Sequence, residues 1–242
     1  MAVPGQNQAV NSRASLSNNP VALIGSGPTS RAITRYLVNE ASAHVVHVGV
    51  DSVSGAVAPC ALAAEINDCR ALVYVPNFDD LTQALAAGAQ RRAQLLERTQ
   101  TVLAAAEQAQ IEHVVVITTA MVYGAQAGQP PLADDAPLNA ETDEGLVGDA
   151  LAIEELIAAT ANGKFTMLRP AALVGPEVDT AATRHFEAPR ILVLRNIPIA
   201  WQFAHVDDVA RAVGHVLQHS LFGPVAVASP GVLTQAEIER LS

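Results

Sequence analysis

The fold is decided by the stretch Val21-Ala22-Leu23-Ile24-Gly25-Ser26-Gly27-Pro28-Thr29-Ser30-Arg31-Ala32-Ile33. It begins as an apolar run, breaks at a Gly-x-Gly turn and continues in a helical pattern, which predicts a β-strand followed by an α-helix. Gly25 permits the sharp turn, and Gly27 lets the backbone approach a pyrophosphate that lies on the positive end of the helix. Ser30 stands where a third glycine is usual, and it meets the need for a small residue between helix and strand. The stretch therefore predicts dinucleotide binding at Gly25, Gly27 and Ser30.

An acidic residue follows at the distance that this motif requires. A second apolar run, 45–50, ends in Asp51 about twenty residues after the turn, where a carboxylate accepts hydrogen bonds from an adenosine ribose. Asp51 also opposes a 2′-phosphate, so NAD is favoured over NADP, and the guanidinium of Arg31 is the counter-argument. In the structural alternative, Asp51 only turns a loop, and Ser30 and Arg31 only begin the helix.

The composition narrows the class of protein. The chain has 242 residues, of which 50% are hydrophobic, so it can bury a full core as one α/β domain. The net charge of −10 argues against a nucleic-acid partner, because such partners require clustered Lys and Arg. No apolar stretch approaches the roughly 20 residues of a membrane span, so no membrane partner is predicted.

The N-terminus and the cysteines bear on the cellular location. Residues 1–19 are rich in Asn, Gln, Ser and Ala, lack the pattern of a signal peptide and predict a disordered leader. Cys60 and Cys69 are the only cysteines, and we expect free thiols in a reducing cytosol. The sequence therefore predicts a cytoplasmic protein.

Predicted strands and helices alternate along the chain, as in a parallel sheet covered on both faces. The predicted strands are 21–24, 44–50, 55–57, 71–75, 111–118 and 165–168, and the predicted helices are 30–41, 61–67, about 79–110, 145–161, 207–218 and a short one from about 234. We therefore expect an α/β fold with a doubly wound, Rossmann-like sheet. Residues 20–168 would form the dinucleotide-binding domain, and 169–242 a reduced C-terminal portion that completes it.

Three further segments resemble the motifs of one family. Residues 117–124 are similar to S-S-x-x-V-Y-G, 169–176 to R-P-x-x-V-x-G-P and 203–212 to F-x-H-V-D-D-V-A-x-A. The chain thereby resembles the extended short-chain dehydrogenase/reductases, the NAD-dependent epimerases and dehydratases of nucleotide sugars. The resemblance implies bound NAD or NADP, a C-terminal portion that holds a nucleotide sugar, and a homodimer formed through helices 90–110 and 145–161. It also implies that Thr118 lines the cofactor site.

The chain departs from the family where the chemistry takes place. The family uses a Tyr-x-x-x-Lys pair, in which the lysine and the cofactor ribose lower the pKa of the tyrosine that exchanges a proton with the sugar. In an alignment anchored at Gly148 and Glu155, Val147 replaces the tyrosine and Leu151 replaces the lysine. Lys164 is the only lysine of the chain, so no shift of register restores the pair.

This departure leaves three hypotheses for the function: a binding protein, an enzyme with a rearranged site and a structural module. Thr119 keeps a hydroxyl at the family's catalytic Ser/Thr position, as a remnant without the proton acceptor. The missing pair favours a non-catalytic binding protein, a sensor or partner. The alternative is an active epimerase/dehydratase or reductase in which Thr119, Tyr123 or His185 transfers the proton. A structural module that has lost its cofactor is the third, since Ala56 replaces an adenine-binding aspartate and Pro28 lacks an N–H donor.

The remaining candidates are histidines and arginines. His44 and His47 lie three apart on a strand and point to opposite faces, and His215 and His219 lie four apart on a helix without a third ligand, so no metal site is predicted. In the short segment where the family builds its substrate pocket, the arginines either bind a diphosphate or offset the acidic surface. These arginines are Arg184, Arg190 and Arg195.

Overall fold

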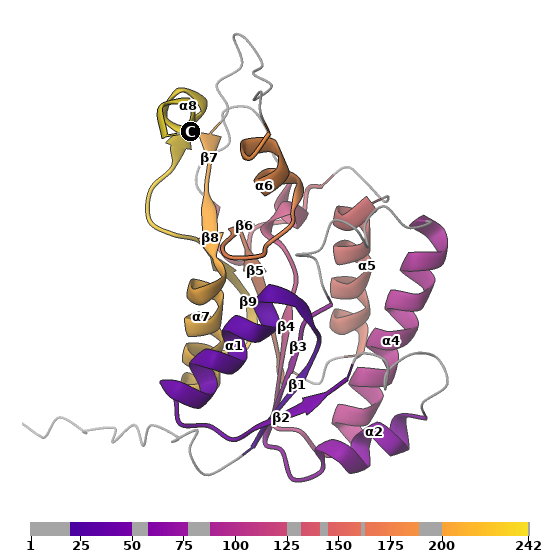
Figure 1. The fold of residues 1–242 in the computed structure, drawn as a ribbon. Helices are drawn as coiled ribbons and strands as arrows, with labels where there is room; N and C mark the ends of the chain where they lie inside the picture. The colour runs from indigo at the N-terminus through magenta and orange to yellow at the C-terminus, as the bar shows by residue number, and fades with distance from the viewer. Residues whose placement is uncertain are drawn as a thin grey trace, which may run out of the picture.

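A six-stranded parallel sheet forms the centre of the protein (Figure 1). The computed structural model describes residues 20–49, 58–76, 88–124, 132–140, 145–160, 163–188 and 200–241. The strands are β1 (Val21–Ile24), β2 (Val45–Val48), β3 (Ala71–Tyr74), β4 (His113–Ile117), β5 (Phe165–Pro170) and β9 (Gly223–Val227). They lie in the order β2-β1-β3-β4-β5-β9, and every neighbouring pair is parallel. The predicted α/β fold with a doubly wound, Rossmann-like sheet is confirmed.

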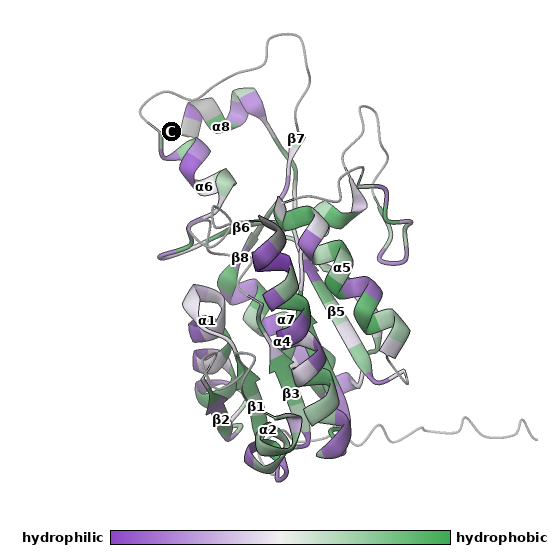
Figure 2. Ribbon diagram, turned by 90° about the vertical axis from the view of Figure 1, so that its right-hand side faces the viewer, coloured by the Kyte–Doolittle hydropathy of each residue, from purple (hydrophilic) through white to green (hydrophobic). Residues whose placement is uncertain are grey.

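Helices cover both faces of the sheet (Figure 1). Helices α1 (Gly27–Asn39) and α7 (Val206–His219) lie on one face, and α2 (Pro59–Ile66), α4 (Gly88–Gln108) and α5 (Gly145–Thr160) on the other. Because successive strand side chains point to opposite faces, Leu23 packs under α1 and α7 while Ala22 packs under the other three helices. Strands buried on both faces read as continuous apolar runs, and Figure 2 shows β1 and β3 as hydrophobic along their length.

Helices α1 and α7 approach each other closely at a glycine. A Cβ atom on Gly214 of α7 would overlap Cε1 of Tyr36 on α1 and would lie 3.2 Å from Cζ of the same ring. The missing side chain of Gly214 therefore makes room for the tyrosine ring between the two helices. This contact joins the helix that follows the glycine turn to a helix from the C-terminal portion.

Small elements extend the molecule beyond the carboxyl ends of the strands (Figure 1). Strands β6 (Ala172–Val174) and β8 (Phe203–His205) pair in parallel, and β7 (Ala200–Trp201) and β10 (Leu233–Thr234) pair in antiparallel. The other elements are the 3₁₀ helix η3 (Ala120–Tyr123) and helices α6 (Ala181–Phe186) and α8 (Gln235–Leu241). Phe186 meets Trp201 and Phe203 edge to face, with ring centroids 5.1 and 5.7 Å apart, so these half-buried rings form an aromatic cluster in this part.

The structure moves several predicted boundaries. Helix α1 begins at Gly27 instead of residue 30, because Pro28 fits the first turn of a helix, where no intrahelical N–H donor is needed. Strand β5 runs on to Pro170, two residues past its last partner on β4, so the missing N–H of this proline costs no hydrogen bond to that strand. Strand β9 and the four short strands were not predicted. Asp51, the segment 55–57, the start of the long helix and two of the arginines, Arg190 and Arg195, lie outside the described residues.

Among the described helices, none combines the length and the hydrophobicity that crossing a bilayer requires.

Candidate functional site

The glycine turn lies at the point where the direction of the sheet connections reverses. From β1 the chain crosses to β2 on one side, while β3 lies on the other side of β1. In open α/β sheets, ligands bind in the crevice that this reversal leaves at the carboxyl ends of the strands. Gly25 and Gly27 follow β1 at this end, so the sequence motif and the sheet topology indicate the same site.

The two glycines meet steric demands that other residues would not. Gly25 has a φ of +144°, and a Cβ there would lie 2.7 Å from both the Cβ and the carbonyl oxygen of Val75. Gly27 has a φ of +89°, which also favours glycine. Ser30 donates a hydrogen bond from Oγ to the carbonyl oxygen of Ser26 at 3.1 Å, so its hydroxyl links the first turn of α1 to the glycine turn.

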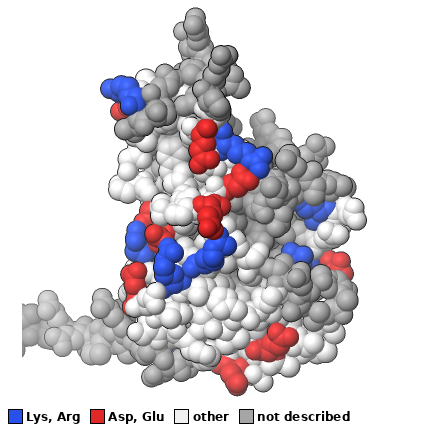
Figure 3. All heavy atoms as spheres, viewed as in Figure 1, with Lys and Arg blue, Asp and Glu red and all other residues white. Residues whose placement is uncertain are grey.

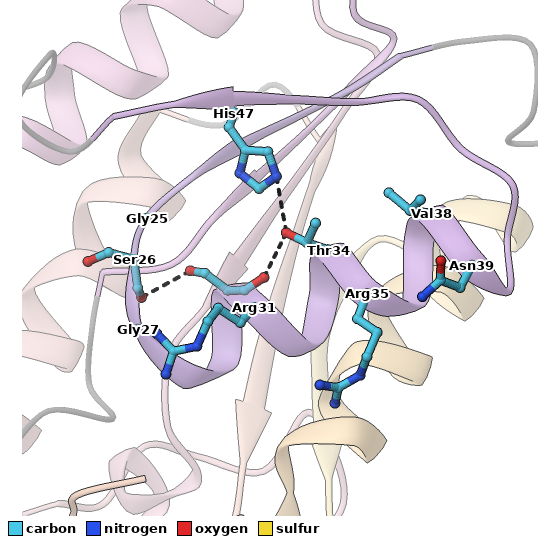
Figure 4. Close-up of a pocket in the computed structure, with 10 residues that line it drawn as sticks. Gly25, Ser26, Gly27, Arg31, Thr34, Arg35, Val38, Asn39 and His47 are labelled. Atoms are coloured by element: carbon cyan, nitrogen blue, oxygen red, sulfur yellow. Dashed lines mark hydrogen bonds between the residues drawn. The ribbon is translucent and has the colours of Figure 1, made fainter. Parts of the chain in front are cut away.

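A pocket of about 530 Å³ opens beside the turn, between α1 and the edge of β2 (Figure 4). Its polar lining comes mostly from α1, whose first turn holds no acidic residue. Arg31 and Arg35 line it from one helix face, and His47 lies across from them with Nε2 3.3 Å from Oγ1 of Thr34. The other lining residues are Gly25, Ser26, Gly27, Ser30, Val38 and Asn39. Positive side chains next to the positive end of a helix favour an anionic group.

This geometry fits the diphosphate of a dinucleotide. The backbone of the turn is bare where Gly25 and Gly27 would otherwise carry Cβ atoms, and Ser26 is the N-cap of a 13-residue helix. Pro28 removes one of the N–H donors that a phosphate would use. Asp51, the predicted partner of the ribose, lies outside the described residues.

Acidic side chains of the C-terminal portion pair with the arginines of the pocket. Glu177 forms an ion pair with Arg31, and Asp207 forms one with Arg35. Figure 3 shows basic and acidic atoms alternating across this face of the molecule. Two more ion pairs of the C-terminal portion are Arg211 with Asp208 and Arg184 with Asp179. The carboxylate of Asp179 accepts two hydrogen bonds from Arg184, at 2.5 and 2.6 Å, so this arginine binds an acidic side chain of its own chain.

The two threonines that follow β4 differ in what their hydroxyls do. Thr118 is fully buried and donates a hydrogen bond to a carboxylate oxygen of Glu154 at 2.6 Å. Thr119 is 9% exposed, and its Oγ1 accepts a hydrogen bond from the backbone N–H of Met121 at 3.3 Å. The hydroxyl of Thr118 thus points into the protein, while Thr119 caps the short helix η3.

Sequence reasoning missed a buried ion pair beside these threonines. Arg169 donates two hydrogen bonds to the carboxylate of Glu154, at 3.1 and 2.6 Å, and both residues are under 5% exposed. The same guanidinium lies 4.8 Å from the ring centre of Tyr123 and donates to the backbone carbonyl of Asp134 at 3.2 Å. An arginine inside an otherwise apolar strand was the available signal, because such a charge needs a buried partner.

Comparison with known proteins defines the family. Residues 86–227 match the sequence profile of the NAD dependent epimerase/dehydratase family. The chain belongs to this family. The match begins after the glycine turn, and it includes all three segments whose motifs carried the resemblance.

Sequence relatives of this family member are distant. A stretch of 135 residues is 24% identical to "Uncharacterized protein Rv0501" of Mycobacterium tuberculosis and to "Uncharacterized protein Mb0513" of Mycobacterium bovis. The stretch covers 54% of this chain and 36% of each relative, so the chain matches about a third of the length of these curated relatives.

Solved structures with the same fold extend over nearly the whole chain. UDP-glucose 4-epimerase of Thermotoga maritima, solved with UDP-glucose, superposes with a TM-score of 0.72 at 12% identity over 92% of this chain and 81% of its own. The dTDP-4-dehydrorhamnose reductase of Clostridium acetobutylicum gives 0.70 at 16% identity over 92% and 80%. The dTDP-glucose 4,6-dehydratase of Bacillus anthracis, solved with NAD, gives 0.69 at 15% identity over 92% and 80%. At these identities the likeness shows the fold.

Helix α5 of this family member contacts Thr118 through one of two adjacent glutamates. Glu154 is the residue of α5 that bonds to Thr118, whereas Glu155 is exposed. Residues four and eight positions earlier share the face of Glu154. These are Ala150, which is fully buried, and Leu146. Glu154 therefore faces inward, together with apolar side chains one and two helical turns earlier on α5.

The proton donors of the alternative hypothesis are engaged in other contacts. Tyr123 is 3% exposed and donates its hydroxyl to the carbonyl oxygen of Asp134 at 2.7 Å. The ring of His185 packs against Phe186 and Trp201, with centroids 4.9 and 6.1 Å apart. Both side chains thus have a structural role that needs no substrate.

Histidine pairs remain isolated from other metal ligands in the described residues. The rings of His215 and His219 lie with centroids 4.4 Å apart at the end of α7. Within the part of the chain that the structure describes, no group of three or more His, Cys, Asp or Glu side chains is placed to hold a metal ion.

Proposed function

We propose that this protein binds NAD at the glycine turn without catalysing epimerisation, dehydration or reduction, and acts as a sensor or binding partner. The observation that carries the proposal is that α5 contains neither a tyrosine nor a lysine. Val147 and Leu151 stand at the two motif positions when α5 is aligned through Glu155, and Leu146 and Ala150 when it is aligned through Glu154, so the tyrosine and the lysine are missing in both registers. Without them no side chain of α5 beside Thr118 holds a proton for the sugar, since Glu154 is tied to Arg169.

Several observations support the dinucleotide. Family membership, the bare backbone at Gly25 and Gly27 and the cationic pocket agree with it, and the neighbour from Bacillus anthracis was solved with NAD. NAD is preferred to NADP because the carboxylate of the predicted Asp51 would oppose a 2′-phosphate. When bound, NAD would bring a hydride acceptor, and Gly25, Gly27, Ser30, Arg31 and the predicted Asp51 would hold it.

The proposal extends to the second ligand and the assembly. A nucleotide sugar or a smaller molecule would bind on the side of Phe186, Trp201 and Phe203, and a neighbour of the same fold was solved with UDP-glucose. A homodimer would form through α4 and α5, as the family resemblance implies. A cytoplasmic location rests on the free thiols of Cys60 and Cys69.

Thermal unfolding with added ligands tests the binding. At 100 times its dissociation constant, a ligand specific for the folded state adds about 2.7 kcal/mol, a rise of several degrees in Tm for a chain of this length. We expect this rise with NAD. Ser26→Asp keeps a good N-cap but puts a carboxylate into the cradle, so it should abolish the rise, while its neutral isostere Ser26→Asn should preserve it.

Turnover assays test the absence of catalysis. We expect no change in NADH absorbance with any member of a panel of UDP- and dTDP-sugars. Turnover that Thr119→Ala abolishes would refute the non-catalytic role and leave the binding role standing.

A further inference from the structure

A tight turn in the C-terminal portion aims an acidic side chain at the dinucleotide site. Gly175 has a φ of +142°, and a Cβ there would lie 2.7 Å from Cγ2 of Val206 and 3.2 Å from Nε2 of His205. The turn is closed by a hydrogen bond from the N–H of Val178 to the carbonyl oxygen of Gly175 at 3.2 Å. The close packing of Gly175 on the start of α7 therefore fixes where the next residues lie.

Glu177, two residues on, has a backbone conformation that few glutamates adopt. Its φ is +63°, in the left-handed region that glycine and asparagine favour. Its carboxylate bonds to Arg31, 146 residues earlier in the chain. Figure 4 shows the Arg31 side chain extending toward the Gly27 end of α1, so the carboxylate lies at the rim of the diphosphate cradle.

We infer that Glu177 is an internal competitor for Arg31 that sets how strongly the site binds ligands carrying a diphosphate. The inference rests on the proposed function, because it concerns the same site. A diphosphate that approaches the start of α1 meets a guanidinium already bound by a carboxylate, and it must displace that carboxylate to bind Arg31. A neutral ligand meets no such competition.

The ion pair is weak enough for this exchange. The side chains of Arg31 and Glu177 are 57% and 73% exposed, and pairs with this much solvent contact contribute little to stability. A phosphate binds a guanidinium through two charge-assisted hydrogen bonds and also gains from the helix end, which Glu177 does not cap. The result is a site in which Glu177 compensates the charge of Arg31 until a more highly charged anion displaces its carboxylate.

Titration of Glu177→Gln tests the inference with NAD, ADP-ribose and adenosine as probes. Removing one negative charge a few ångströms from the diphosphate should tighten NAD and ADP-ribose by about three- to tenfold at low ionic strength, and screening at 1 M salt should erase the gain. Adenosine, which carries no charge, should bind equally to both proteins. In an Arg31→Gln background the effect of Glu177→Gln should shrink, because the contested guanidinium is gone.

Glu112→Gln is the matched control. Glu112 pairs with Arg70 at 2.6 Å, with side chains 60% and 42% exposed, next to the amino ends of β4 and β3, whereas the glycine turn follows the carboxyl end of β1. This variant should leave all three affinities unchanged.

The outcomes separate this inference from the proposed function. Binding of NAD that Glu177→Gln leaves unchanged or weakens overturns the role of Glu177 and leaves the binding function standing. Binding that appears only in the variant supports the inference in its strongest form. No binding of NAD or ADP-ribose to either protein overturns the proposed function, and the inference with it.

Discussion

Replacing Arg169 with methionine should destabilise the protein strongly, although Arg169 lies in no predicted site. Arg169→Met keeps an unbranched side chain in strand β5 but removes the guanidinium that bonds Glu154 at 3.1 and 2.6 Å. Among the described residues, Glu154, which is 3% exposed, then keeps the hydroxyl of Thr118 as its hydrogen-bond partner. The carboxylate is left inside the protein without its counter-charge.

The magnitude follows from this burial. Breaking a buried ion pair by removing one partner costs about 3–5 kcal/mol. The contact with the Tyr123 ring and the hydrogen bond to the carbonyl of Asp134 are lost as well, so the upper half of that range is expected. For a chain of this length the loss lowers Tm by roughly 10 °C or more.

Urea and thermal denaturation measure the effect. Arg70→Met is the control, since Arg70 also bonds a glutamate at 2.6 Å but on the surface, and its loss should cost no more than about 1 kcal/mol. The double variant Arg169→Met, Glu154→Gln should recover part of the stability because no buried charge remains. A loss in Arg169→Met no larger than in Arg70→Met would refute the reasoning.

Three further predictions concern packing, acid sensitivity and the helix register. Gly214→Ala should destabilise by about 1–3 kcal/mol in urea, against the usual gain of alanine in a helix, because its Cβ would overlap Tyr36; a stabilised variant would contradict this close approach. Burial lowers the pKa of His113 from 6.5 to about 4. Because the unfolded chain then binds the proton more tightly than the folded one, the contribution of His113 to the free energy of unfolding is fully present above pH 6.5. It should fall by up to about 3 kcal/mol as the pH drops to 4. His113→Gln should flatten this slope and His44→Gln, on an exposed residue, should not; equal slopes in all three proteins would argue against the buried imidazole. Leu146→Tyr with Ala150→Lys should produce measurable turnover of a sugar nucleotide with NAD in the absorbance assay, with thermal unfolding as the check on folding. Val147→Tyr with Leu151→Lys should produce no turnover, and the reverse result would favour the alignment through Glu155.

The centre of the fold could be predicted because its strands are buried on both faces. Strand β1 was predicted with its observed bounds, and β3 and β4 were predicted within two residues at each end, since an unbroken apolar run between helical patterns indicates a parallel strand. The turn after β1 followed from two glycines. Strand β9 was missed because its first residues, Gly223 and Pro224, usually interrupt strands, and the shortest strands contain too few residues for any periodicity.

The candidate site was harder to predict because its partners are distant in the sequence. The sequence around Arg31 allows a cofactor contact or the start of a helix, whereas the structure pairs this residue with Glu177, 146 residues away. The choice between Glu154 and Glu155 depends on the rotation of α5 about its axis, and one residue changes that rotation by about 100°. Only the packed structure decides which of the two adjacent carboxylates faces inward.

The contact between Gly214 and Tyr36 has a practical consequence for dissection of this protein. A fragment that ends at Thr160, before β5, contains the glycine turn and α1 but leaves Ile33 and Leu37 without the helix that covers them, and the remaining fragment carries that cover as α7. The chain is thereby suited to split-fragment complementation. A ligand that orders the turn should promote reassembly of the two pieces, so that association itself becomes the signal of binding.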